Sequence, residues 1–210
     1  RLNTTRLLIK AMQKAKQKPK LLINASAIGV YGSSLDQEFD EESPTGSDFL
    51  ANICNQWENI ASEKPNQTRL VIIRIGIVLG ENGGALKKML PIFKAGLGGP
   101  IGNGSQWMSW IHRTDFCRIV ESSIKNKSYK GIINAVAPDP ISMNVFARTL
   151  GSCLGRPSLL NVPGPILKLI LGDGARVVLE GQNVQSKRFK KLKFKFKFPT
   201  LNDAFKGILT

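Results

Sequence analysis

The sequence has few cysteines and a single histidine, which limits the metal and disulfide chemistry open to it. Cys54, Cys117 and Cys153 are widely spaced and odd in number. This argues against a disulfide framework and against a paired-cysteine metal site. His112 has no second histidine or cysteine at ligand spacing, as a zinc site would require. We therefore expect unpaired thiols and no bound metal.

Long apolar runs are also missing. No stretch reaches the roughly 18 to 20 apolar residues that cross a bilayer, and no charged-then-apolar segment at the start resembles a signal peptide. With 42% apolar residues among 210, the chain can still bury a core. We expect a soluble intracellular protein, located in the cytoplasm or, if the source is a plant, in the plastid stroma.

Acidic residues are half as frequent as basic ones, 15 against 30, so the formal net charge is +15. A polyanion-binding surface is one interpretation of this excess. The lysines are spread along the chain in K-x-x-K and K-x-K patterns that suit a face turned to water. A solvated basic surface is therefore favoured, with local anion sites such as one for a cofactor phosphate, and nucleic-acid binding is disfavoured.

The hydrophobic pattern alternates between helical and strand periods. Residues 1–16 have one apolar helical face, and residues 21–25 form the short continuous apolar run of a strand buried on both faces. The further expected helices are 48–64, capped by Ser47 or Asp48, 85–95, 115–124, capped by Asp115, and 142–154; the further strands are 70–80 and 131–137. This alternation predicts an α/β fold with a parallel sheet.

Several apolar side chains of the expected helices have the spacing of a buried face. The residues that we expect inside are Phe49, Ile53 and Ile60 in the second helix, Phe116, Ile119, Val120 and Ile124 in the fourth, and Val145, Phe146 and Leu150 in the fifth.

After residue 155 the pattern changes. Residues 163–181 are expected to be mostly helical, and residues 191–198 alternate lysine with leucine or phenylalanine. That alternation predicts a strand with an apolar inner face and a lysine outer face. A basic ribbon for nucleic acid or lipid is disfavoured, because aromatic rings that face a core cannot stack on bases. We place one domain at 1–155 and a small α+β domain at 156–210.

Three motifs occur in an order and at distances that carry a family resemblance. They are Ser26-Ala-Ile-Gly-Val-Tyr-Gly32, Arg74-x-Gly-x-Val-Leu-Gly80 and Trp110-Ile-His-x-x-Asp115. Together they resemble the extended short-chain dehydrogenase/reductase superfamily. Gly83-Gly-Ala-Leu86, Gly96-Leu-Gly-Gly-Pro100 and Asn134-Ala-Val-Ala-Pro138 narrow the resemblance to its atypical, epimerase-like branch with a small C-terminal domain, whose members in cyanobacteria and plants are often labelled cell-division-inhibitor-like.

The resemblance implies a Rossmann-like sheet and an NADP or NAD cofactor. The family's first strand and its glycine-rich phosphate loop have no counterpart in this sequence, which begins at Arg1. We therefore expect an N-terminally truncated fragment that lacks the first half of the sheet. The residues that the resemblance assigns to cofactor binding are Arg1, Ala25, Ser26 and Val78. The alternative for Arg1 is that it is a solvent-exposed residue at the chain end with no role in binding. Arg74 lies on an expected buried strand, and we expect it to pair with a carboxylate.

For catalysis, the resemblance points to Ser26, which corresponds to a hydroxyl donor to the reacting oxygen, although plain turn chemistry is equally open. Active relatives carry a Tyr-x-x-x-Lys pair in which the lysine lowers the pKa of the phenol. Counting back from Glu58, the equivalent positions are Leu50 and Cys54, which cannot transfer that proton. Tyr31 is an alternative phenol, or part of a pocket wall.

The glycine-rich run at 96–104 and the residues behind it suggest a substrate pocket between the two parts of the chain. We expect Gly98, Asn103, Gln106 and Trp107 to line this pocket. In the resemblance, the segment from His112 to Asp115 is mainly a structural hinge, and a general base at His112 is the lesser alternative.

The sequence therefore predicts an NAD(P)-dependent reductase or epimerase that acts on an unknown small molecule without the Tyr-Lys pair. A non-catalytic cofactor-binding regulator linked to cell or plastid division is the alternative. Whether the protein is an enzyme stays open at this point, as does a homodimer.

Overall fold

A computed structural model describes residues 1–81, 83–161 and 181–209. Its centre is a parallel sheet in the order β1-β3-β7, formed by Leu21–Ala27, Arg69–Ile75 and Gly131–Ala135. The strands are in register from Leu21 opposite Arg69 to Ala27 opposite Ile75. The predicted α/β fold with a parallel sheet is confirmed. β1 lies at the edge of this sheet, and Ala25 in its middle is exposed.

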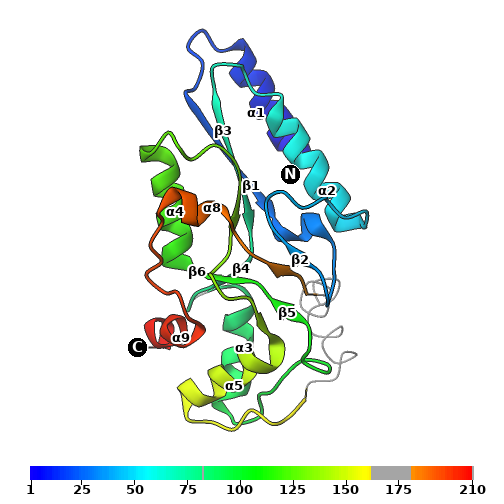
Figure 1. Ribbon diagram of the computed structural model, residues 1–210, viewed down its shortest axis with the longest axis vertical. Helices are drawn as coiled ribbons and strands as arrows, with labels where there is room; N and C mark the ends of the chain where they lie inside the picture. The colour runs from blue at the N-terminus through cyan, green and yellow to red at the C-terminus, as the bar shows by residue number, and fades with distance from the viewer. Residues whose placement is uncertain (82, 162–180, 210) are drawn as a thin grey trace.

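Helices cover both faces of the sheet (Figure 1). On one face, α1 (Leu2–Lys14) and α2 (Phe49–Ser62) pack Ile9, Met12 and Ile60 against Leu22 of β1. On the other face lies α4 (Arg113–Lys125), where Ile119 joins Val71, Ile73 and Ile133 from the strands. Asp48 caps α2 as predicted, because its Oδ1 accepts the N–H of Ala51 at 2.8 Å.

A second apolar cluster lies beyond the carboxyl end of the sheet. The helices α3 (Gly84–Lys94), α5 (Met143–Leu154) and α9 (Leu201–Leu209) meet there around Trp110, Phe146 and Phe205. Short strand pairs join this region to the sheet: β4 (Ile77–Leu79) with β6 (Trp110–His112), β5 (Trp107–Met108) with β8 (Ile141–Ser142), and β2 (Glu38–Phe39) with β9 (Asn183–Val184). The cluster is thus tied to the sheet through residues far apart in sequence.

The expected strand 70–80 is divided at Gly76. β3 stays in the central sheet, whereas β4 leaves it and pairs in parallel with β6. A Cβ at Gly76 would lie 2.5 Å from the carbonyl oxygen of Ser109, so only glycine allows this close backbone approach. The division opens space between β3 and β4 at the carboxyl edge of the sheet.

Three predicted core residues are wrong. Phe49 is 71% exposed, Ile124 60% and Val145 45%. Each belongs to an amphipathic helix, but apolar spacing alone does not show which flank of a wide apolar stripe meets the core. Their neighbours Ile60, Ile119 and Phe146 are buried as expected.

The cap of α4 also differs from the prediction. The helix begins at Arg113, and its N-cap is His112, whose Nδ1 accepts the N–H of Thr114 at 3.0 Å. Asp115 is fully buried in the first turn, where its two oxygens accept the N–H groups of Lys197 and Phe198 at 2.8 and 2.9 Å. Those amides have no strand partner, and the buried carboxylate satisfies them.

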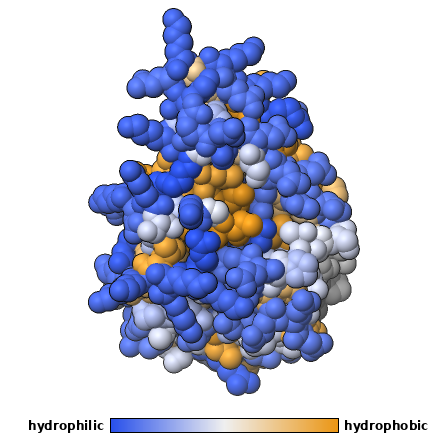
Figure 2. Space-filling view, turned by 45° about the horizontal axis from the view of Figure 1, so that its top comes forward, coloured by the Kyte–Doolittle hydropathy of each residue, from blue (hydrophilic) through white to orange (hydrophobic). Residues whose placement is uncertain are grey.

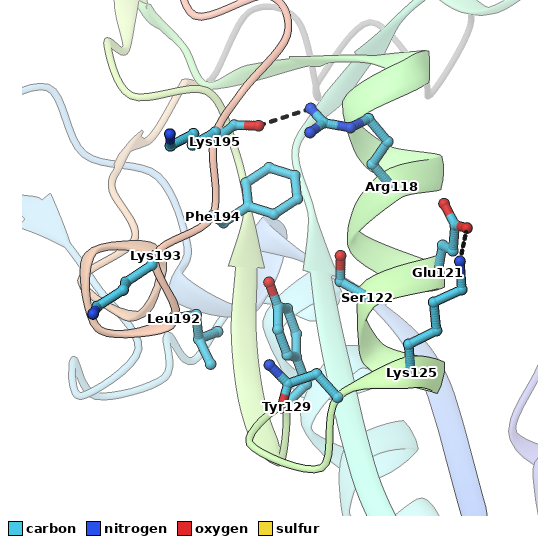
Figure 3. A pocket seen from close by; sticks show the side chains of 10 residues that line it. Arg118, Glu121, Ser122, Lys125, Tyr129, Leu192, Lys193, Phe194 and Lys195 are labelled. Atoms are coloured by element: carbon cyan, nitrogen blue, oxygen red, sulfur yellow. Dashed lines mark hydrogen bonds and ion pairs between the residues drawn. The ribbon is translucent and has the colours of Figure 1, made fainter.

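The strand expected at 191–198 does not form. Helix α8 (Arg188–Leu192) ends there, and Lys193 has a left-handed backbone. The segregation of the two residue types is nevertheless as expected: Phe194 and Phe196 pack on Phe189 with ring centroids 5.0 to 5.2 Å apart. Figure 3 shows Phe194 turned toward α4, while the side chains of Lys193 and Lys195 point away from it. The helix predicted for 163–181 lies outside the described residues up to 180.

The surface view shows how hydrophilic and apolar residues are distributed over one face (Figure 2). Figure 2 shows one face of the molecule covered mostly by hydrophilic residues, with an apolar patch in its middle. Among the described residues, no helix is long and apolar enough to span a membrane.

The only histidine offers a pH test of the packing around α4. Burial lowers the pKa of His112, against the opposing effect of Asp115 and together with Arg113 and Lys197. The unfolded chain therefore takes up a proton near pH 6.5 that the folded chain takes up only at lower pH. We expect the free energy of unfolding to fall as the pH is lowered below about 6.5.

His112→Asn keeps a good capping side chain but removes the titration, so its stability should depend less on pH between about 7 and 5.5. Chemical denaturation across this range measures the difference. An NMR titration midpoint of the imidazole at or above the ordinary histidine value would contradict the expectation.

Candidate functional site

A cavity of about 490 Å³ opens at the carboxyl ends of β1 and β3, where open α/β sheets place their ligands. It lies between the first turns of α2, the 3-10 turn η1 (Ile28–Tyr31) and β4. The described residues that line it are Arg1, Ala27, Ile28, Gly29, Ser33, Asp48, Leu50, Ile53, Cys54, Trp57, Ile75, Gly76, Ile77, Val78, Gly84, Ala85, Trp107, Ser109 and Gln182. Its volume is in the range of small-molecule sites, which is about 300 to 1,000 Å³.

Leu50 and Cys54, one turn apart on α2, both line this cavity. Burial raises the pKa of the Cys54 thiol, although the backbone of Ala27 and the hydroxyl of Ser26 act in the opposite direction. The thiol is therefore protonated at neutral pH, and Leu50 carries no proton to exchange. At the two positions where sequence counting placed the missing Tyr-Lys pair, the cavity wall is apolar.

Ser26 and Tyr31 belong to a buried polar network next to the cavity. Ser26 Oγ donates a hydrogen bond to Glu58 Oε1 at 2.6 Å. Arg74 makes a bidentate pair with the same carboxylate: Nε donates to Oε1 at 2.9 Å, and Nη2 donates to Oε2 at 2.8 Å. Arg74 Nη1 also donates to Tyr31 Oη at 2.9 Å, and that hydroxyl donates to Asn134 Oδ1 at 2.8 Å. The predicted pairing of Arg74 with a carboxylate is confirmed.

This network is closed to solvent. Ser26, Glu58, Arg74 and Tyr31 are each at most 5% exposed. Burial raises the pKa of the Tyr31 phenol, although Arg74 lowers it, so the phenol is neutral. Neither Ser26 nor Tyr31 is among the described residues that line the cavity. Both hydroxyls donate their proton to a partner inside the protein.

Two of the residues predicted for cofactor binding reach the cavity. Arg1 lies at its rim with the guanidinium carbon 5.3 Å from the ring centroid of Trp57, and Val78 lines it from β4. Ala25 is exposed on the edge strand β1, two residues before Ala27, which does line the cavity. Arg1 is the only cationic side chain among its described lining residues.

Of the four residues predicted for the substrate pocket, the structure brings Trp107 to the cavity, and its Nε1 donates to the carbonyl of Leu35 at 2.7 Å. The other three build the preceding turns. Gly98 packs against the Phe93 ring, Asn103 Oδ1 accepts from the N–H of Ser105, and buried Gln106 donates to the carbonyl of Ile101. They are not among the described residues of the cavity wall.

Ile53 and Trp57 line the cavity but were not predicted from the sequence as lining residues. Both follow Leu50 at helical spacing on α2, so the periodicity could have predicted one continuous stripe with Cys54. Gly76 and Ser109 were also not predicted. The interior glycine of an expected strand was the available signal for Gly76, while no local pattern marks Ser109. Among the described residues, no cluster of three potential metal ligands exists.

Comparison with known proteins identifies relatives across the whole chain. A model of the NAD dependent epimerase/dehydratase family matches residues 1–135, and a domain of unknown function, DUF1731, matches residues 162–208. The chloroplastic epimerase family protein SDR39U1 homolog of Arabidopsis thaliana is 47% identical over 93% of this chain and 56% of its own length. The chain thus spans little more than half of that relative. The predicted domain boundary after residue 155 stays a prediction.

Solved structures agree with the sequence relatives. The crystal structure of human epimerase family protein SDR39U1 (isoform 2) with NADPH has a TM-score of 0.94 at 39% identity, over 99% of this chain and 71% of the human one. UDP-glucuronic acid 4-epimerase from Bacillus cereus, in complex with UDP-glucuronic acid and NAD, has a TM-score of 0.76 at 16% identity, over 99% and 65%. The second likeness shows the fold alone.

The buried pair of Glu58 and Arg74 gives a stability test. Glu58→Gln leaves a buried guanidinium without its charge partner, which we expect to lower the free energy of unfolding by about 3 to 5 kcal/mol. Glu63→Gln, the same change at an exposed position just after α2, should change it by less than about 0.5 kcal/mol. Denaturant unfolding of both variants measures this. Equal stabilities would mean that the pair does not hold α2 to β3.

Proposed function

The chain belongs to the NAD-dependent epimerase/dehydratase family, and on that premise we propose that the protein binds NADP(H) and acts on a small molecule as an oxidoreductase or epimerase. The cavity at the carboxyl ends of β1 and β3 is the observation that carries this proposal. A human relative of nearly the same fold was crystallised with NADPH, which favours NADP(H) over NAD(H). The resemblance read from the motifs is confirmed by the family match.

The residues of this cavity fit the nicotinamide end of such a cofactor. The wall at Ala27, Gly29 and Val78 is apolar or small, which leaves room for a flat ring. The guanidinium of Arg1 would hold a phosphate or ribose oxygen, and the backbone of Val78 would hold the carboxamide. When bound, the nicotinamide gives or accepts a hydride.

The protein's own side chains supply little acid-base chemistry at this place. Leu50 and Cys54 occupy the wall where a phenol and an ammonium would be needed, and the thiol stays protonated. The bonds of Ser26 and Tyr31 within the Glu58–Arg74 network support positioning roles for them, at the end of β1 and in η1. We propose that they fix the shape of the cavity mouth.

The lack of a proton-transferring pair also supports a second candidate, a cofactor-binding regulator without catalysis. The two candidates share cofactor binding and differ in turnover. If the protein oxidises NADPH only when a carbonyl compound is added, it is an enzyme and the non-catalytic candidate is excluded.

Cofactor binding itself is testable on the complete protein. We expect saturable NADPH binding in isothermal titration calorimetry. Arg1→Ala should weaken it about 10- to 100-fold, because a charge-assisted hydrogen bond contributes about 1.5 to 3 kcal/mol. Arg6→Ala changes an exposed arginine of the same helix, outside the described cavity wall, and should leave the affinity unchanged. The proposal fails if NADPH does not bind, and the role of Arg1 fails if both variants weaken it equally.

A further inference from the structure

The wall of the cavity is mainly apolar. Among its 19 described lining residues, the side chains of 11 are apolar. They are Ala27, Ile28, Leu50, Ile53, Cys54, Trp57, Ile75, Ile77, Val78, Ala85 and Trp107. Two of these are tryptophans, whose large flat rings contribute more contact area than aliphatic side chains. Ala27 and Val78 are assigned above to the nicotinamide, and the other nine side chains favour a second ligand with an extended apolar surface.

The polar groups in the wall are largely engaged within the protein. Ser109 Oγ donates to the carbonyl of Gln182 at 2.7 Å and accepts the N–H of Val184 at 2.9 Å. Asp48 Oδ1 caps α2, and the indole N–H of Trp107 is bonded to Leu35. A ligand rich in hydroxyl groups would lose hydrogen bonds to water and find few replacements here.

The charges at the cavity also disfavour a nucleotide sugar. Its diphosphate needs several cationic or amide donors, and Arg1 is the one cation among the described lining residues, already assigned above to the cofactor. The carboxylate of Asp48 lies in the same wall and would repel a second diphosphate. The described lining residues thus offer little to hold the diphosphate of a nucleotide sugar.

We propose that the substrate side of this cavity takes a planar, apolar carbonyl compound, of the size of a substituted naphthalene, rather than a nucleotide sugar. This inference rests on the proposed function, since it names the substrate class of the same site. Leu50, Ile53 and Trp57 form one stripe of α2 in the cavity wall, and Trp107 of β5 lines the same cavity. The carbonyl oxygen is the single polar atom that such a ligand leaves to be satisfied.

The test uses the complete protein and two probes, 2-acetonaphthone and UDP-glucuronic acid, each titrated by calorimetry in the presence of saturating NADP⁺. The oxidised cofactor cannot reduce the ketone, so binding is read without turnover. We expect saturable binding of 2-acetonaphthone and none of UDP-glucuronic acid at the same concentrations.

A matched pair of variants locates the binding. Leu50 is 39% exposed and Phe49 beside it is 71% exposed and outside the described cavity wall, so asparagine at either position is compatible with folding. Leu50→Asn should weaken 2-acetonaphthone binding at least tenfold, Leu50→Ala less, and Phe49→Asn not at all. The thermal midpoints of all three variants report whether they remain folded.

The outcomes separate this inference from the proposed function. Binding of NADPH together with UDP-glucuronic acid but not 2-acetonaphthone overturns the inference and leaves the proposed function in place. Equal affinities in Leu50→Asn and Phe49→Asn also overturn it, since the probe would then bind elsewhere. Failure of NADPH to bind overturns the proposed function. If 2-acetonaphthone then still binds in a way that depends on Leu50, the apolar binding site is supported although the proposed function is not.

Discussion

The buried ion pair between Glu58 of α2 and Arg74 of β3 holds together the parts that shape the cavity. One carboxylate accepts three hydrogen bonds, two from the guanidinium and one from Ser26 at the end of β1. The guanidinium also holds Tyr31 in η1, and Tyr31 in turn reaches Asn134 of β7. A helix, three strands and a turn are thereby fixed to one another, because two buried charges cannot separate without a large desolvation cost.

This constraint explains why an apolar cavity can exist beside a polar core. The groups of Ser26, Tyr31, Glu58 and Arg74 bond with one another inside the protein. The part of the cavity wall beside them is formed by apolar side chains, among them Leu50, Cys54 and Trp57.

The regular elements could be predicted from the sequence because their periods are local properties. α2 with its cap at Asp48, the strands β1 and β7, and the pairing of Arg74 with a carboxylate followed from spacing and burial rules. The interior glycine was a signal for a break at Gly76, but the close approach to the carbonyl of Ser109 that requires it is not visible in the sequence. The loss of the strand at 191–198 could not be predicted, because it depends on the distant carboxylate of Asp115. The site shows the same limit: the motif placed Ser26 near the ligand, but not the inward turn of its hydroxyl toward Glu58.

In the segment after α8, residues 193–198, the side chains that pack inward and those that carry charge are different residues. Phe194 and Phe196 pack inward on Phe189, while Lys193, Lys195 and Lys197 are exposed, and Asp115 fixes the backbone through its amides. Exchange of the Lys195 or Lys197 side chain therefore leaves the contacts among Phe189, Phe194 and Phe196 and the amide bonds to Asp115 in place. The surface charge of this segment can therefore be altered without disturbing the packing of its phenylalanine rings.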